Sequence, residues 1–336
     1  MKHSRNLRIW LAFGLMAAVL LLCREAVTAR LQGFFAREEV ASFLLYLETG
    51  RAIHLSDLPE ETAAPTTLPP ETDAPTEPTQ GPTLISGSDT VNIRDSSGLR
   101  YDAQALLEKP LAWNLADGEP RVLVFHTHAT ESYTPTQDHP YKESSYYRTL
   151  ENEDNMTAVG QRLAQGLEQA GIGVIHDVTF HDYPSYNGSY ANARKTVKKH
   201  LEQTPTLCLL LDVHRDAVET STGKQLPTRI TVDGQPVAQI MLVVGTNAGG
   251  LYNPDWQENL ALALKLQYQL ETLCPGICRY ISLRRERFNQ DLLPGTVLVE
   301  VGAAGNTLEE ALAAADILAQ AIAALSGGTA TAGSTS

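Results

Sequence analysis

Three residues with metal-binding side chains stand close together in the chain, where His126, His128 and Glu131 follow the apolar run 122–125. A catalytic zinc site takes three ligands of this kind from the protein and leaves a fourth position for water. His128 and Glu131, spaced H-x-x-E, supply two of them, and the distant His214 supplies the third. Zinc activates water and polarises a carbonyl group, so the set indicates hydrolysis of an amide bond.

A fourth residue, Glu300, has the place of a general base. It lies at the end of the apolar run 296–299, and His128 and His214 follow apolar runs in the same way. A carboxylate beside an activated water can take its proton. If the runs are parallel strands, their carboxyl ends meet at one edge of a sheet, where open α/β sheets bind ligands.

Two ligand positions stay open in the sequence. His126 competes with His128, because alternate residues of a strand point to the same face. We prefer His128, which lies just past the strand, and otherwise expect His126 to pack in the core or to orient a ligand through a hydrogen bond. Glu131 could instead pair with Arg148 or cap a turn.

Further polar residues could line the same cleft. Asp212, Arg215 and Asp216 flank the second histidine ligand, and Arg215 with Asp216 could form an ion pair. The Tyr-rich segment HDYPSYNGSY and the segment FNQDLLPGT could form the rim of the cleft.

Apolar periodicity predicts the elements that would position these residues. Between residues 95 and 326, strand-like apolar runs alternate with stretches of helical spacing, so we predict an α/β fold with a mixed, mostly parallel sheet flanked by helices. The predicted strands are 122–125, 171–176, 207–213 and one from residue 296, with a hairpin turning at Asp233 and Gly234. The predicted helices are 155–170, 190–203, 255–273 and a last one opened by Asn306 with Glu309 as a capping box.

The composition limits the class of protein. The 336 residues are 43% hydrophobic, which suits one sizeable folded domain, and carry a net charge of −13. Nucleic acid is set aside as a partner, because binding it normally requires basic stripes. Cys274 and Cys278, spaced CPGIC, could pair in an oxidising compartment and receive no catalytic role.

The N-terminal region divides by composition. A basic start and the uncharged stretch 9–23 favour an uncleaved membrane anchor over a secretory signal cleaved after Ala29, and either way the rest is exported. A later stretch rich in Pro, Thr and Glu is too polar to fold. The predicted parts are a membrane anchor (1–30), an amphipathic juxtamembrane segment (31–56), a disordered linker (57–94), the zinc hydrolase domain (95–326) and a disordered tail (327–336).

Five segments within residues 95–326 together resemble one protein family. They are HTHATESY, YNGSYANARKTV, LDVHRDAV, VVGTNAGGLYNPDWQENLALA and FNQDLLPGTVLVEVGAAGNTLEEA. The combination closely resembles the stage II sporulation protein P family, which is similar to zinc-dependent N-acetylmuramoyl-L-alanine amidases. The order H-x-x-E, His, Glu also resembles that of zinc carboxypeptidases.

The resemblance implies a peptidoglycan hydrolase that removes stem peptides from glycan strands and could also cut peptide cross-links. It implies Zn²⁺ held by His128 and His214, with Glu300 as catalytic glutamate, whereas Glu131, the third ligand that the spacing suggests, has competitors. In related amidases the ligand glutamate lies further along the chain. The residues that compete with Glu131 are therefore Glu151, Glu153, Asp154 and Asn155.

The resemblance also implies a setting. The family works in engulfment of the forespore, so we expect a single-pass protein of the cell membrane whose catalytic domain faces the space between mother cell and forespore. The implied partners are stage II sporulation protein D, a lytic transglycosylase, and stage II sporulation protein M, a membrane scaffold.

Two other functions stay open. A carboxypeptidase-like metallopeptidase would need an arginine to clamp the free carboxylate of its substrate, and Arg215 is the obvious candidate. A catalytically inactive wall-binding scaffold would have no need for His128, His214 and Glu300 at strand ends.

Overall fold

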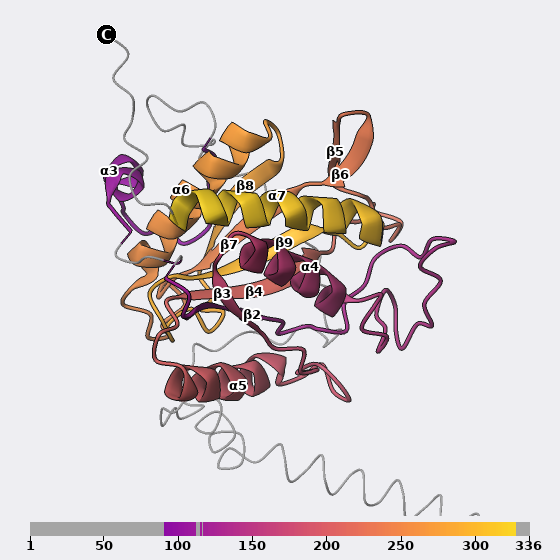
Figure 1. Ribbon diagram of the computed structural model, residues 1–336, viewed down its shortest axis with the longest axis horizontal. Helices are drawn as coiled ribbons and strands as arrows, with labels where there is room; N and C mark the ends of the chain where they lie inside the picture. Colours follow the sequence, from indigo (N-terminus) through magenta and orange to yellow (C-terminus); the bar gives the residue numbers. More distant parts are fainter. Residues whose placement is uncertain (1–90, 112–114, 116, 327–336) are drawn as a thin grey trace, which may run out of the picture. The chain divides into compact units, whose positions relative to one another are not determined.

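The computed structural model describes residues 91–111, 115 and 117–326 (Figure 1). These residues belong to the second of two compact units, Pro75–Ser336. The predicted anchor, juxtamembrane segment and tail lie outside the described residues, as does the predicted linker up to residue 90. Among the described residues, no helix has the length and apolar character needed to cross a membrane.

In the described part of the chain, one mixed sheet holds seven strands, in the order β1-β8-β7-β9-β4-β2-β3, and β5 and β6 form a separate hairpin. The strands are β1 (Ile93–Asp95), β2 (Pro120–Phe125), β3 (Gly173–His176), β4 (Leu209–Asp216), β5 (Arg229–Val232), β6 (Gln235–Ala238), β7 (Ile240–Gly245), β8 (Cys278–Arg284) and β9 (Thr296–Ala303). Strands β3, β2, β4 and β9 are parallel, whereas β7 is antiparallel to β9 and parallel to β8. The predicted mixed, mostly parallel sheet is confirmed.

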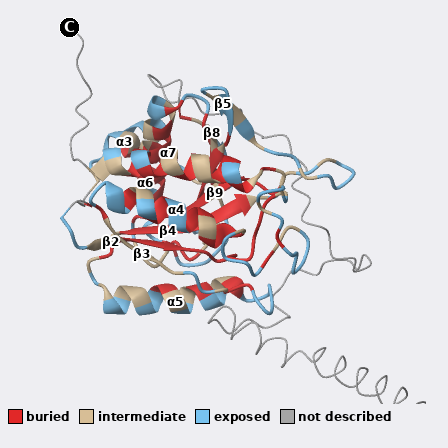
Figure 2. Ribbon diagram, turned by 45° about the vertical axis from the view of Figure 1, so that its right-hand side comes forward, coloured by how far each residue is buried: buried red, intermediate tan, exposed pale blue. Residues whose placement is uncertain are grey.

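Helices cover both faces of this sheet. They are α3 (Ala103–Glu108), α4 (Met156–Gln169), α5 (Ser189–Gln203), α6 (Trp256–Leu273) and α7 (Leu308–Ser326). Figure 1 shows α4, α6 and α7 on one side of the strands and α5 on the other. The central strands between these layers are buried, as Figure 2 shows in red.

Helix α4 shows how the sequence sets these layers. Asn155 caps the helix, because its side chain accepts a hydrogen bond from the Thr157 N–H at 2.9 Å. Val159, Leu163 and Leu167 recur every four residues and are fully buried. Burial of each such side chain contributes about 1.5–3 kcal/mol, so packing of this apolar stripe is what holds the helix on the sheet.

Two strands continue past their predicted ends. Strand β4 runs through His214 to Asp216, and β9 runs through Glu300 to Ala303. The prediction that His214 follows its strand is therefore wrong. A buried strand can carry these polar residues because their side chains find polar partners, as Asp212 does with His214.

The cap of the last helix lies one residue later than predicted. The Glu310 N–H donates to Thr307 Oγ1, and the Thr307 N–H donates to Glu310 Oε2, both at 3.3 Å. The capping box is thus Thr307 with Glu310, and the predicted pair Asn306 and Glu309 is wrong. The side chain of Asn306 is engaged elsewhere, because it accepts the Ala303 N–H at 2.8 Å.

Strands β1 and β8 were not predicted. They pair in parallel at one edge of the sheet, with Ile93 opposite Ile281. Both isoleucines are buried in the main core. The predicted boundary between linker and domain, at residue 95, therefore falls inside β1.

Candidate active site

The candidate site is built on β4 and β9, which pair in parallel with His214 opposite Glu300. Alternate residues of β4, such as Leu211 and Val213, pack in the main core beside α4 and α7. Asp212 and His214 therefore point to the other face of the sheet, toward α5. Glu300 shares this face, because the side chains that precede and follow it in β9 also pack in the main core.

The loop after β2 brings the other two predicted residues to the same place. The ring centroids of His128 and His214 are 5.3 Å apart in an edge-to-face arrangement. Glu131 Oε2 lies 3.5 Å from His214 Nδ1. The predicted ligands His128 and Glu131 are thus neighbours of the third, His214, which comes from a distant part of the chain.

Asp212 orients the ring of His214. His214 Nε2 donates to Asp212 Oδ1 at 2.8 Å, and the N–H and hydroxyl of Thr127 donate to the same carboxylate. Burial alone would lower the pKa of His214, but the carboxylates of Asp212 and Glu131 raise it well above the ordinary value. The two carboxylates therefore stabilise a positive charge on the His214 ring. Nε2 of this ring faces Asp212, and Nδ1 faces Glu131.

Two arginines contact the carboxylate of Glu131, which is held in the ionised form. Arg148 Nη2 donates to Glu131 Oε1 at 3.2 Å, and the Arg215 N–H donates to Glu131 Oε2 at 3.4 Å. Burial opposes ionisation, but Arg215, His214 and His128 lower the pKa of Glu131 below its usual range. The predicted pairing with Arg148 is thus confirmed alongside the contact with His214.

Arg215 is fixed inside the protein. Its guanidinium donates to the carbonyl oxygens of Ser132 and Tyr147 at 2.9 and 3.0 Å, and the side chain is buried. It does not pair with Asp216 as predicted, because Asp216 accepts from Arg279 on β8. Arg215 therefore orders the loop around Glu131 instead of presenting donors to a substrate.

His128 is enclosed by two tyrosines. Tyr186 stacks on its ring with centroids 4.5 Å apart and planes 5° from parallel, and Tyr190 meets it edge to face. Burial lowers the pKa of His128 to about 4, so the ring is neutral near pH 7. Its Nδ1 is buried without a hydrogen-bond partner among the described residues and lies 3.8 Å from Asp182.

Glu300 has the opposite electrostatic character to Glu131. Its Oε2 is buried and has no hydrogen-bond partner among the described residues. Burial and the neighbouring carboxylates of Asp216 and Glu131 raise its pKa to about 8. A carboxyl group kept in such surroundings has the proton affinity that a general base needs near neutral pH.

His126 lies on the other face of the sheet, so the prediction that it shares a face with His128 is wrong. The chain leaves the strand after Phe125, and His126 Nδ1 donates to Val213 O at 2.8 Å. Its Nε2 therefore accepts from His176 Nε2 at 3.0 Å. A Cβ on Gly160 of α4 would lie 2.5 Å from His126 Nε2, so only glycine fits there. The alternative expectation, a packed core histidine, is confirmed.

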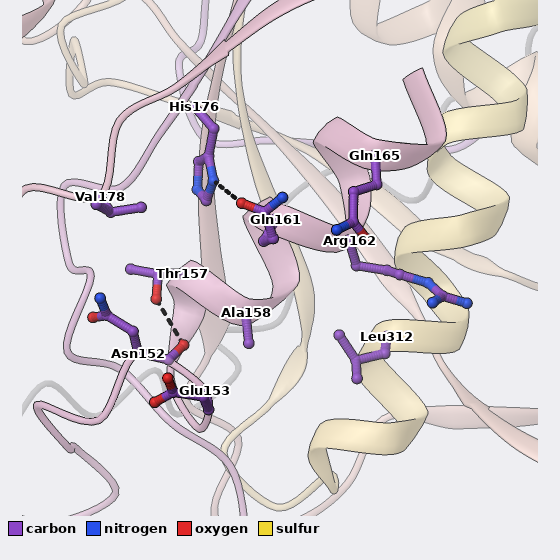
Figure 3. Close-up of a pocket in the computed structure, with 10 residues that line it drawn as sticks. All are labelled: Asn152, Glu153, Thr157, Ala158, Gln161, Arg162, Gln165, His176, Val178 and Leu312. Atoms are coloured by element: carbon purple, nitrogen blue, oxygen red, sulfur yellow. Dashed lines mark hydrogen bonds between the residues drawn. The ribbon is translucent and has the colours of Figure 1, made fainter. Parts of the chain in front are cut away.

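The four residues that compete with Glu131 have partners other than His128 and His214 or line a different pocket. Asp154 binds His139 at 2.7 Å, Asn155 caps α4, and Glu151 accepts from the Lys142 N–H. Glu153 lines a separate pocket between α4, α7 and the end of β3, shown in Figure 3. This pocket reaches His176 but contains none of the four predicted site residues. Among the candidates, only Glu131 contacts His214.

The donor set fits a zinc ion, although no three His, Cys, Asp or Glu side chains among the described residues already stand close enough to enclose a metal. Nδ1 of His128 has no hydrogen-bond partner in that part of the chain, and Nδ1 of His214 faces Glu131 Oε2 at 3.5 Å. The Asp212 contact on the far nitrogen of His214 is the usual support of a metal-binding histidine.

The Tyr-rich segment 181–190 makes contacts that the sequence did not predict. Asp182, whose side chain is fully buried, accepts from Thr130 Oγ1 and from Arg148 Nη1, both at 2.6 Å, which ties the β3–α5 loop to the segment that carries Glu131. The Tyr-rich segment was predicted as a rim of the cleft, and two of its tyrosines, Tyr186 and Tyr190, contact the ring of His128. The segment FNQDLLPGT acts mainly in packing, because Gln290 bonds to the end of β7 and Asp291 pairs with Arg194.

Comparison with known proteins places the chain. The sequence profile of the stage II sporulation protein P (SpoIIP) family matches residues 55–323. The chain belongs to this family. Stage II sporulation protein P of Bacillus subtilis (strain 168) is 30% identical over 216 residues, which cover 59% of this chain and 50% of that protein. The match thus spans about half the length of this relative.

Solved structures of amidases are similar at a lower level. The Ami1 N-acetylmuramyl-L-alanine amidase of Mycobacterium smegmatis matches 64% of this chain and 99% of its own, with 15% identity and a TM-score of 0.37. The CwlD amidase of Clostridioides difficile, solved in complex with the GerS lipoprotein, matches 60% of this chain and 94% of its own, with 14% identity and a TM-score of 0.36.

Proposed function

We propose that this protein is a zinc-dependent peptidoglycan hydrolase, an N-acetylmuramoyl-L-alanine amidase that removes stem peptides from glycan strands. The observation that carries the proposal is the convergence of His128, Glu131 and His214 on one side of Glu300. Membership of the SpoIIP family supports a sporulation role, and the motif resemblance supports the cell-wall substrate.

His128 and His214 would bind the metal through Nδ1, and Glu131 through Oε2. Zinc, when bound, supplies Lewis-acid activation of water and of the scissile carbonyl. Asp212 keeps the ring of His214 in position through Nε2. Arg215 helps to keep Glu131 ionised, as a carboxylate ligand must be, and Arg148 donates a hydrogen bond to the same carboxylate.

Glu300 would move the proton in this reaction. Ionised, it would accept a proton from the attacking water and pass it to the leaving amine. A cation held by the neighbouring ligands would lower its pKa from about 8, so the ionised form would be present near neutral pH. The stacked ring of Tyr186 restricts access of bulk water to His128.

The fixed position of Arg215 favours an amidase over a carboxypeptidase. A carboxypeptidase clamps the free carboxylate of its substrate, and Arg215 is buried and bonded to two backbone carbonyls. An amidase that cuts between glycan and peptide has no such requirement. Activity on peptide cross-links stays part of the proposal as a second cleavage.

We propose the cellular setting on the basis of the family resemblance. The chain would work outside the cytoplasm on a membrane anchor at residues 1–30, during engulfment of the forespore. Stage II sporulation protein D would supply the glycan cleavage that complements removal of peptides, and stage II sporulation protein M would hold the enzyme at the membrane.

Product analysis tests the proposed reaction. The purified chain is incubated with zinc and peptidoglycan, and the soluble fragments are identified by mass spectrometry. We expect free stem peptides with a new N-terminal amine. Glu300→Gln should retain zinc and wall binding, while release falls by about 100-fold or more.

A matched variant separates catalysis from folding. Glu309→Gln changes an exposed glutamate of α7 outside the site and should release peptides at the normal rate. Unchanged release by Glu300→Gln would contradict the role given to Glu300. Absence of both peptide release and zinc binding in the unmutated chain would favour the inactive scaffold.

A further inference from the structure

A row of side chains leads from Glu300 across the sheet on the face that α5 shares. Met241 of β7 lies directly opposite Glu300. Met241 packs in one cluster with Leu298 of β9 and Tyr280 of β8. The row therefore connects the catalytic end of β9 with β8, near the far edge of the sheet.

Strand β8 is irregular where it meets this row. Ile240 pairs with Cys278, but Leu242 pairs with Ile281, so β8 carries one extra residue between these pairs. A bulge re-aims side chains, and two consecutive residues, Arg279 and Tyr280, come to lie beside Met241. The Arg279 guanidinium carbon lies 5.4 Å from the centroid of the Tyr280 ring, over its face.

A second arginine joins this ring from the edge strand. The guanidinium carbon of Arg94, on β1, lies 4.8 Å from the centroid of the Tyr280 ring, and Arg94 Nη1 donates to the Tyr280 hydroxyl at 3.0 Å. Two guanidinium groups thus share one tyrosine, which fixes both against the sheet.

The charges at this ring are not balanced. Arg279 pairs with Asp216, two residues after His214. Arg94 is exposed and forms no ion pair with any residue that the structure describes. The chain as a whole carries a net charge of −13, yet Arg94 has no carboxylate paired with it among the described residues. Its positive charge is therefore available to a ligand.

We propose that Arg94 and Arg279, held on the ring of Tyr280, form an anion-binding subsite for a carboxylate in the peptide part of the substrate. This inference rests on the proposed function and extends it from the bond that is cut to the group that is recognised. The guanidinium fork matches a carboxylate in shape and charge.

The spacing of the strands defines the expected ligand. Neighbouring strands lie about 4.8 Å apart, so the backbone of Tyr280, two strands from Glu300, is about 10 Å from that of Glu300. Arg94 is three strands away and pairs with Ser282, two residues past Tyr280, so its backbone is about 16 Å from that of Glu300. An extended peptide advances about 3.4 Å per residue. A carboxylate about three to five residues from the scissile amide therefore reaches the subsite.

Binding measured without turnover tests the subsite. The full-length chain with zinc and the Glu300→Gln change is titrated calorimetrically with a muramoyl pentapeptide, and with the same pentapeptide whose carboxylates are amidated. We expect about two- to fivefold tighter binding of the free-carboxylate form, the range of one partly exposed ion pair. Adding Arg94→Gln should abolish this difference, and Arg94→Lys should restore part of it.

Arg100→Gln is the matched control, because Arg100 is an exposed arginine just after β1. It should leave the difference intact. Equal affinity of the two peptides, or an Arg94→Gln variant that still discriminates between them, would overturn the subsite. Cleavage by the unmutated chain is measured separately: if neither peptide is cut while the binding difference holds, the hydrolase proposal fails and the subsite stands.

Discussion

Glu300 on β9 lies directly opposite His214 on β4, in a parallel pairing that also sets Leu298 opposite Asp212. The proposed base and a proposed ligand are thus positioned by the backbone hydrogen bonds of two buried strands. Strands hold side chains more rigidly than loops do. The separation of the two groups should therefore survive changes in the surrounding loops.

The contact between Asp212 and His214 predicts an effect on metal affinity. Asp212→Asn keeps the size of the side chain but weakens its hold on the proton of His214 Nε2. We expect zinc affinity to fall by about 10- to 100-fold, the usual effect of losing such a partner. Competition with a chromophoric chelator measures this affinity.

A second histidine–aspartate pair provides the control. His200 Nε2 lies 2.8 Å from Asp177 Oδ2, the same distance as in the pair at the site. Asp177→Asn should leave zinc affinity unchanged. Equal affinities of the Asp212→Asn and Asp177→Asn variants would show that Asp212 does not support a ligand.

The identity of the third ligand can be tested by exchanging single glutamates. Glu131 contacts His214, whereas Glu151 is exposed and bonds to the Lys142 backbone. Glu131→Gln should abolish stoichiometric zinc binding, measured by mass spectrometry of metal content after dialysis. Glu151→Gln should bind one zinc, and the reverse pattern would reassign the ligand.

The pair His126 and His176 predicts acid sensitivity. Burial lowers the pKa of His176 from 6.5 to about 4, so at intermediate pH the unfolded chain binds a proton that the folded chain does not. As the pH falls from about 6.5 toward about 4, this difference in proton binding lowers the free energy of unfolding. Above about pH 6.5 neither state binds the proton, so the free energy of unfolding is not reduced. Urea denaturation of the metal-free chain, at several pH values, measures it.

Replacing the histidine should reduce that loss. In His176→Gln the free energy of unfolding should fall less on acidification, by up to about 1.4 kcal/mol per pH unit. His126, whose pKa burial lowers to about 3, still makes its own contribution to the loss of stability on acidification. The unmutated chain is the control, and identical pH profiles for it and for His176→Gln would contradict the account.

The shifted capping box predicts unequal roles for two adjacent glutamates. Glu310 is buried and accepts from Arg229 Nη1 and Asn306 Nδ2, both at 2.6 Å. Glu310→Gln should lower the free energy of unfolding by about 1–3 kcal/mol. Glu309→Gln changes an exposed side chain and should stay within about 0.5 kcal/mol. Chemical denaturation compares the two, and equal losses would restore the predicted cap.

Much of the fold could be predicted because its central strands are apolar runs that end in polar residues. His128, His214 and Glu300 follow or end such runs, and their convergence follows from parallel pairing. The order of strands could not be predicted, because it depends on pairing between distant segments. Strand β8 was missed because arginines interrupt its apolar alternation, in the segment CRYISLR.

Most contacts that support the site could not be predicted from the sequence, because they join segments that are distant in the chain. Asp212 stands two residues from His214, and that spacing on one face of a strand was the available signal for their hydrogen bond. The partners of Arg215 and Asp216 come from other elements, so a local ion pair was expected where none forms. His126 lies on the other face of the sheet from His128 because the strand ends at Phe125.

Metal dependence of peptide release tests the central claim most directly. Stem peptides released from purified peptidoglycan are counted for the full chain before chelation, after chelation, and after zinc is added back in known amounts. We expect release to stop on chelation and to return in proportion to bound zinc, complete at one equivalent per chain. Release that continues in chelator, or none with one zinc bound, would contradict the account.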